Sequence, residues 1–134
     1  MFSLSKAKKA LQASEEKASK LGIAVATVVI DSQGSIVAAS RMDGAIPISP
    51  RFAYAKAYTS ASLGVPSEGL AQYAEEGKPY FGITDIFGGE LTPIAGGVPI
   101  KVNGKIVGGI GVGGSMDVSQ DAQCAKEAAK VVEG

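Results

Sequence analysis

The two arginines of the chain, Arg41 and Arg51, stand on either side of a loop that covers residues 42–50. A guanidinium binds carboxylate or phosphate through a rigid fork of donors, whereas each lysine offers only a point charge. The pair therefore suggests a clamp for a small anionic molecule, with Asp43 beside it. The alternative is that Arg41 pairs with Asp43 or with a chain terminus and only shapes the loop.

Glycines provide a second candidate for binding. Gly96 and Gly97 can turn backbone N–H groups toward an anion, as glycine-rich nests do. The segment lacks the Walker lysine spacing and no helix follows it, which excludes a nucleotide P-loop. The glycines of residues 108–114 superficially resemble a dinucleotide fingerprint, but they lie in a predicted hairpin. We expect them to permit the close approach of another backbone.

Proton transfer has three candidates: Lys56, Tyr58 and Asp85. A desolvated lysine can act as a base or form a Schiff base, but the ordinary expectation for Lys56 is an exposed or interface position. Tyr58 lies four residues after Tyr54 on a predicted helix, so the two rings are expected to pack together. Asp85 lies in a loop, where a solvated carboxylate is the usual outcome.

The chain contains no histidine. This excludes a Ser–His–Asp triad, a Cys–His dyad, and zinc or haem held by histidine. The single cysteine, Cys124, cannot form an intrachain disulfide, which fits a reducing compartment. It lies next to the apolar stripe of a predicted helix, so we expect a partly buried, inert thiol. The acidic residues show no EF-hand or paired spacing, and we predict no metal site.

These residues must be positioned by two hairpins and several helices. Apolar residues recur at three- and four-residue steps over residues 3–21 and 118–132, which predicts a helix at each end of the chain. A helix over 50–63, a short helix over 67–76 and an aromatic, glycine-rich loop over 78–90 are predicted between the hairpins. The Asn103-Gly104 turn is a strong hairpin signal. The predicted strands cover residues 23–30, 35–41, 91–94, 98–102 and 105–112.

This order of elements predicts an α+β fold with about five mostly antiparallel strands and a middle helix pair. The terminal helices are expected on one face of the sheet. The early hairpin argues against a Rossmann fold, in which a crossover helix would come next. A length of 134 residues favours a single domain, residues 1–134, and 46% hydrophobic residues with 19% charged residues exclude disorder.

Charge and hydropathy bear on the partners. The formal net charge is zero, so nothing in the charge balance predicts binding to nucleic acid or to an anionic membrane. A neutral chain is also prone to self-association, which favours a homo-oligomer. The N-terminus is charged from Lys6 onward and lacks the apolar run of a signal peptide, and the apolar stretch 23–30 is too short to span a bilayer. We therefore expect a cytoplasmic protein.

Six segments follow one another with a family-like spacing. They are the hairpin turn Asp31-Ser-Gln-Gly34, then Arg41-Met-Asp-Gly-Ala45, Tyr54-Ala-Lys-Ala-Tyr-Thr-Ser-Ala61, Gly96-Gly-Val-Pro-Ile100, the glycine-rich run from Gly104 to Gly114, and the acidic segment from Asp117 to Asp121. In this order they resemble the GlcG/HbpS-like family, also called the haem-degrading or PduO C-terminal domain family. The resemblance covers nearly the whole chain.

The resemblance implies a profilin-like fold, a homo-oligomer, and binding of haem or a corrinoid. The missing histidine departs from the haem-binding members, so tyrosine, methionine, cysteine or lysine would have to hold the iron. We therefore expect a small-ligand-binding protein for an anionic metabolite or a tetrapyrrole. Two alternatives remain open: a lyase, isomerase or hydratase acting on a small oxygenated acid through Lys56, Tyr58 or Asp85, and a purely structural assembly protein.

Overall fold

One antiparallel sheet organises the chain in the computed structural model, which describes residues 3–133. Its four strands are arranged in the order β2-β1-β4-β3, so the two predicted hairpins meet through the central pair β1 and β4. The α+β class and both hairpins are confirmed. The strands are β1 (Ala26–Asp31), β2 (Ile36–Arg41), β3 (Gly97–Val102) and β4 (Lys105–Gly113).

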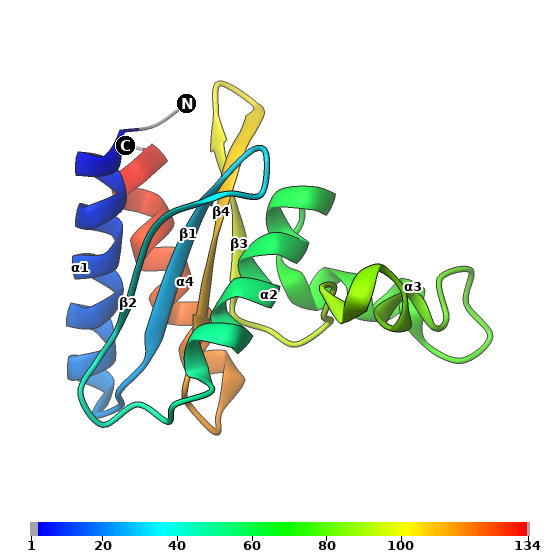
Figure 1. The fold of residues 1–134 in the computed structure, drawn as a ribbon, viewed down its shortest axis with the longest axis horizontal. Helices are drawn as coiled ribbons and strands as arrows, with labels where there is room; N and C mark the ends of the chain where they lie inside the picture. The colour runs from blue at the N-terminus through cyan, green and yellow to red at the C-terminus, as the bar shows by residue number, and fades with distance from the viewer. Residues whose placement is uncertain (1–2, 134) are drawn as a thin grey trace.

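Helices cover both faces of the sheet. The terminal helices α1 (Leu4–Leu21) and α4 (Val118–Glu133) lie side by side on one face, as predicted, and α2 (Ser49–Leu63) lies on the other (Figure 1). The Ser3 hydroxyl accepts a hydrogen bond from the Lys6 N–H at the start of α1. The main core therefore forms between the sheet and the two terminal helices.

The β4 glycines determine how closely α2 can approach the sheet. A Cβ at Gly109 would lie 2.5 Å from the Ala57 carbonyl oxygen, and one at Gly113 would lie 2.9 Å from the Ser49 carbonyl oxygen. A Cβ at Gly111 would collide with the Ala53 carbonyl oxygen. The predicted close approach of another backbone to this strand is thus confirmed, because only glycine leaves room for the helix.

The fifth predicted strand, residues 91–94, is absent: residues 3–133 contain four strands, and this segment is irregular. Pro93 has no N–H to give to a ladder. Backbone groups on either side of it bond to side chains instead of a strand. The Thr92 N–H donates to Thr59 Oγ1 at 2.9 Å, and Ser67 Oγ donates to the Ile94 carbonyl oxygen at 2.7 Å. The segment is held against α2 and the turn that follows it.

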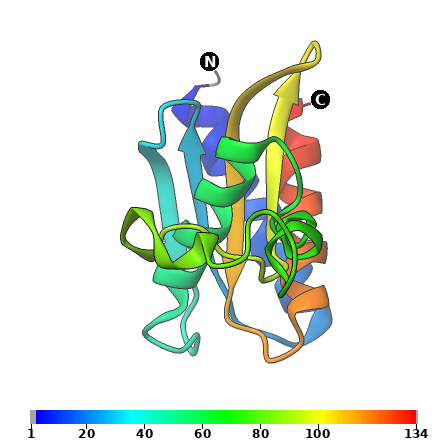
Figure 2. The ribbon, with the colours of Figure 1, turned by 90° about the vertical axis from the view of Figure 1, so that its right-hand side faces the viewer.

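The short helix predicted over 67–76 divides in two. A 3₁₀ turn, Ser67–Leu70, leads into the single-turn α3, Ala71–Ala74, and two further 3₁₀ turns follow at Ile83–Asp85 and Phe87–Gly89. Residues 71–90 project from the body as an arm (Figures 1 and 2). Among residues 3–133, no helix has the length and apolarity needed to cross a membrane.

Candidate functional site

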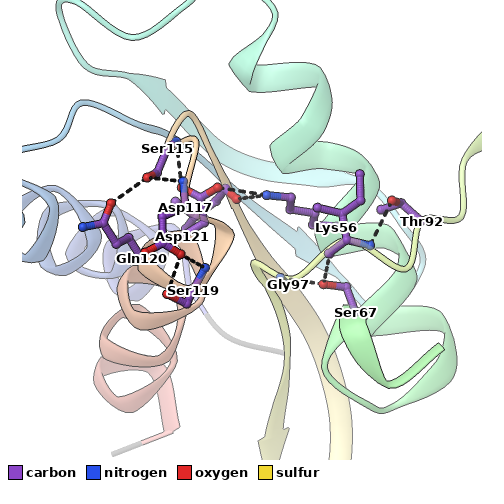
Figure 3. Close-up of polar contacts among 11 residues, drawn as sticks. Lys56, Ser67, Thr92, Gly97, Ser115, Asp117, Ser119, Gln120 and Asp121 are labelled. Atoms are coloured by element: carbon purple, nitrogen blue, oxygen red, sulfur yellow. Dashed lines mark hydrogen bonds and ion pairs between the residues drawn. The ribbon is translucent and has the colours of Figure 1, made fainter. Parts of the chain in front are cut away.

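A buried ion pair joins α2 to the start of α4. The Lys56 ammonium lies 3.1 Å from Asp121 Oδ2 and donates a hydrogen bond of 2.8 Å to the Val112 carbonyl oxygen. Asp121 Oδ1 accepts a hydrogen bond of 3.1 Å from the Ser115 N–H (Figure 3). Lys56 is 2% exposed and Asp121 is 1% exposed. The exposed or interface position expected for Lys56 is therefore wrong within this chain.

Glycines leave the space that Lys56 occupies. A Cβ at Gly96 would lie 2.7 Å from Lys56 Nζ, and one at Gly97 would collide with the Lys56 carbonyl oxygen. Gly96 has a φ of +130°, which disfavours any other residue. The Gly96-Gly97 step thus positions the lysine by its lack of side chains.

A network of short side chains fixes the carboxylate. Ser115 Oγ donates to Gln120 Oε1 at 2.6 Å and accepts from the Asp117 N–H at 3.1 Å. Asp117 Oδ1 in turn accepts from the Ser119 N–H at 3.0 Å (Figure 3). These bonds satisfy N–H groups at and just before the start of α4, as side chains at a helix N-cap do. They hold the first turn of the helix, and with it Asp121, in one geometry.

Burial moves both members of the pair toward their neutral forms. It lowers the pKa of Lys56, although the neighbouring Asp121 opposes the shift. Burial likewise raises the pKa of Asp121, against the effect of Lys56 and of the Ser115 N–H. Desolvation disfavours a charge of either sign, so both directions have one physical cause. The lysine therefore gives up its proton more readily than an exposed lysine does.

A pocket of about 230 Å³ reaches this pair from the surface. Apart from Lys56 and Asp121, its lining carries no charged side chain. Five large apolar side chains surround it, and all are exposed, from Val118 at 38% to Met116 at 98%. We call these five residues the apolar rim: Ile46, Phe52, Ile94, Met116 and Val118. The site combines an apolar entrance with a polar floor.

The predicted arginine clamp does not line this pocket. Arg41 and Asp43 are exposed near the end of β2, and residues 3–133 contain no ion pair between them. Arg51 lines a separate open hollow of about 670 Å³, together with Tyr54 and Glu90. The structure therefore places Arg51 beside a cavity of its own.

The other predicted site residues serve the fold or lie elsewhere. The Gly97 N–H donates to Ser67 Oγ at 2.9 Å, so this amide is already used within the chain. Tyr58 stacks on Tyr54 with ring centroids 6.0 Å apart, which confirms the predicted packing. Asp85 is exposed on the arm. Of the three proton-transfer candidates, Lys56 alone lines the pocket above the pair.

Comparison with known proteins now identifies the family. The family model "Haem degrading protein HbpS-like" matches residues 2–130. The chain belongs to the HbpS-like family. This confirms the resemblance.

The HbpS-like relatives match most of the chain. GlcG of Escherichia coli strain K12 is 35% identical over 102 residues, which are 76% of this chain and 73% of GlcG. A double mutant of Streptomyces reticuli HbpS is 34% identical, with 100% of this chain and 88% of that chain covered and a TM-score of 0.91. A PduOC:heme complex shares the fold at 24% identity, with a TM-score of 0.93 and coverage of 98% and 95%.

Sequence reasoning missed Asp121 as a site residue of this HbpS-like protein. A signal was present, because Asp121 is three residues after Val118 and four before Ala125. Both belong to the predicted apolar stripe of the last helix. An acid within such a stripe is buried and needs a cationic partner.

Cys124 lies in the main core and is fully buried. Burial, with a contribution from Asp121, raises the pKa of its thiol to about 11. The predicted burial of this cysteine is confirmed, and it is complete rather than partial. Residues 3–133 contain no group of three cysteine, aspartate or glutamate side chains that could hold a metal ion.

Proposed function

We propose that this HbpS-like protein binds a tetrapyrrole, haem or a corrinoid, across the apolar rim. The observation that carries the proposal is the gathering of five exposed, large apolar side chains around one pocket. Exposed apolar residues scattered singly need no explanation, but a contiguous apolar patch marks a binding surface. The matches to HbpS and to a PduOC:heme complex support a tetrapyrrole as the ligand.

The size of the pocket determines how such a ligand can sit. Pockets for drug-sized ligands are commonly about 300–1,000 Å³, and this one is about 230 Å³. A macrocycle is too large to be enclosed here. It would lie across the rim, with one edge over the polar floor.

A ligand that lies across the rim needs a donor atom for its iron or cobalt, and the sulfur of Met116 is placed to supply it. Its side chain is 98% exposed and belongs to the rim. Cys124 is enclosed in the core, and the sulfur of Met42 already accepts a hydrogen bond of 3.4 Å from the Val25 N–H. Thioethers are established axial ligands of haem iron. A bound haem would supply a redox-active iron, and Met116 would hold it.

A haemin titration followed by visible absorption tests this proposal. We expect Ile94→Asp, which puts a charge on the rim, to weaken haemin binding at least tenfold. Ile36→Asp is the matched control, because Ile36 is an exposed isoleucine on β2 outside the rim. Met116→Leu keeps the apolar surface and removes the sulfur, so it should change the spectrum of the complex more than the affinity. Equal affinity of the two aspartate variants would refute the rim as the site.

A small anionic metabolite is the second candidate ligand. The exposed guanidinium of Arg51, which lines its own hollow beside Tyr54, favours it. A thermal-shift screen with small hydroxy- and oxo-acids, on the wild type and on Arg51→Ala, separates this candidate from the first. Stabilisation that depends on Arg51, without any haemin complex, would favour the metabolite.

We further propose that the protein forms a homo-oligomer through the arm. Tyr80, Phe81, Ile86 and Phe87 all project from it with exposures of 50–65%. Burying such side chains contributes about 25 cal/mol for each Å² removed from water. Light scattering after size exclusion should give a smaller mass for Phe81→Ser/Phe87→Ser than for the wild type. An unchanged mass would exclude the arm as the contact.

The chain also fits a single domain in the cytoplasm. Its terminal helices share one core with the sheet, and its lone cysteine is a free, buried thiol. Free thiols persist in reducing compartments. Fluorescence of a fusion protein in fractionated cells would test the location.

A further inference from the structure

The amine of Lys56 has more donor capacity than its hydrogen bonds within residues 3–133 use. An ammonium has three N–H groups, and the Val112 carbonyl oxygen and Asp121 Oδ2 accept two of them. Lys56 and Asp121 both line the pocket, and their side chains are 3% and 1% exposed. A molecule that enters past the rim therefore meets an amine and a carboxyl group together.

The amine is also fixed in place. The Val112 carbonyl and Asp121 hold it from two directions, and Gly96 leaves it room on a third. Asp121 is itself held by the Ser115 N–H. A nucleophile and a proton-transfer group with preset geometry lower the entropic barrier of a reaction. An apolar pair of similar volume would often stabilise a core equally well, so stability alone does not explain this pair.

The lining of the pocket defines the class of molecule that fits. The ion pair has no net charge and no other charged side chain lines the pocket, so an uncharged ligand is favoured. A volume of about 230 Å³ suits a compact molecule. Phe52, Ile94 and Val118 favour a short hydrocarbon body. A small aldehyde or ketone has these properties, with one polar atom for the floor.

We propose that Lys56 forms an imine with a small, uncharged aldehyde or ketone in this pocket. The Nζ lone pair attacks the carbonyl carbon, a C–N bond forms, and the carbonyl π bond breaks to give a carbinolamine. The two amine protons leave with the carbonyl oxygen as water, and a C=N bond results. Asp121 carries protons between nitrogen and oxygen during these steps. No oxidant or reductant is needed.

The protonation of the pair supports this chemistry. Only a neutral amine attacks a carbonyl. Burial lowers the pKa of Lys56 and raises that of Asp121. The amine is therefore neutral at a lower pH than an exposed lysine, and the carboxyl group is better able to donate a proton to the departing water.

Reductive trapping of the wild-type protein tests the proposal. The protein is treated near neutral pH with limiting propanal and cyanoborohydride, and the propylated lysines are identified by peptide mass mapping. We expect Lys56 to be labelled at least tenfold faster than the exposed Lys101 and Lys105. Labelling of Lys101 and Lys105 with Lys56 unmodified would overturn the proposal.

One variant tests the role of Asp121. Asp121→Asn should slow the labelling of Lys56 at least tenfold and leave Lys105 unchanged, in protein whose circular dichroism matches the wild type. Labelling of Lys56 at the wild-type rate in this variant would exclude Asp121 as the proton carrier. The haemin titration reads a different property, so the tetrapyrrole proposal and this inference can fail separately.

Discussion

Removing one member of the buried pair should strongly destabilise the protein. In Lys56→Met, Asp121 keeps its Ser115 hydrogen bond but loses the ammonium 3.1 Å away, and the Val112 carbonyl loses its donor at 2.8 Å. Breaking a buried pair in this way costs about 3–5 kcal/mol. For a chain of this length we expect the melting temperature to fall by about 10 °C or more.

The double variant Lys56→Met/Asp121→Leu tests whether the loss of stability comes from leaving one charge buried without its partner. It removes both charges, and replacing a buried pair with apolar side chains is often neutral or stabilising. We therefore expect the double variant to be more stable than Lys56→Met by about 2 kcal/mol or more. The coupling free energy follows from a double-mutant cycle.

Urea unfolding followed by circular dichroism measures the wild type, Lys56→Met, Asp121→Leu and the double variant. One protomer concentration must be used, because the stability of an oligomer depends on it. A loss below about 1 kcal/mol in Lys56→Met would show that the pair contributes little. A double variant whose loss equals the sum of the single losses would show that the two side chains do not interact.

Three further predictions concern the core and the segment beside α2. The pKa of the Cys124 thiol is about 11 in the folded protein and 9.0 ordinarily, so its contribution to stability is complete below pH 9 and is lost as the pH rises toward 11. The free energy of unfolding should fall by about 2–3 kcal/mol over this range, whereas Cys124→Ala should lack this part of the fall. Gly111→Ala should destabilise by about 1–3 kcal/mol in urea unfolding because it pushes α2 off the sheet. Gly69→Ala, whose Cβ would meet only a valine side chain, should change little. Ser67→Ala removes hydrogen bonds to the Ile94 carbonyl and the Gly97 N–H. It should cost about 1–3 kcal/mol and speed hydrogen exchange at Gly97, and unchanged exchange would contradict this role.

Local signals in the sequence were sufficient for most of the fold. The Asn103-Gly104 turn and the three- and four-residue periodicity of the terminal helices act within a few residues, so they predict hairpins and helices directly. The glycines of β4 are also a local pattern, and they predicted the close approach of another backbone to this strand. The strand predicted over 91–94 failed because its backbone bonds to side chains of Thr59 and Ser67, which no local pattern records.

The candidate site was harder to predict because its parts are distant in the chain. Lys56 and Asp121 are 65 residues apart, and no local sequence pattern around either residue indicates that the two are in contact. A lysine on a helix is ordinarily exposed, and it is the packing of α2 against β4 and the start of α4 that buries this one. The rim likewise draws Ile46, Ile94 and Met116 from three separate segments.

The most direct test of tetrapyrrole binding is native mass spectrometry, paired with a visible absorption spectrum. It is applied to the protein as purified from cells and again after incubation with haemin or cobalamin. We predict an oligomer that carries the mass of the tetrapyrrole, with a shifted absorption band, and loss of both in Ile94→Asp but not in Ile36→Asp. A colourless protein of unliganded mass under all three conditions would contradict tetrapyrrole binding.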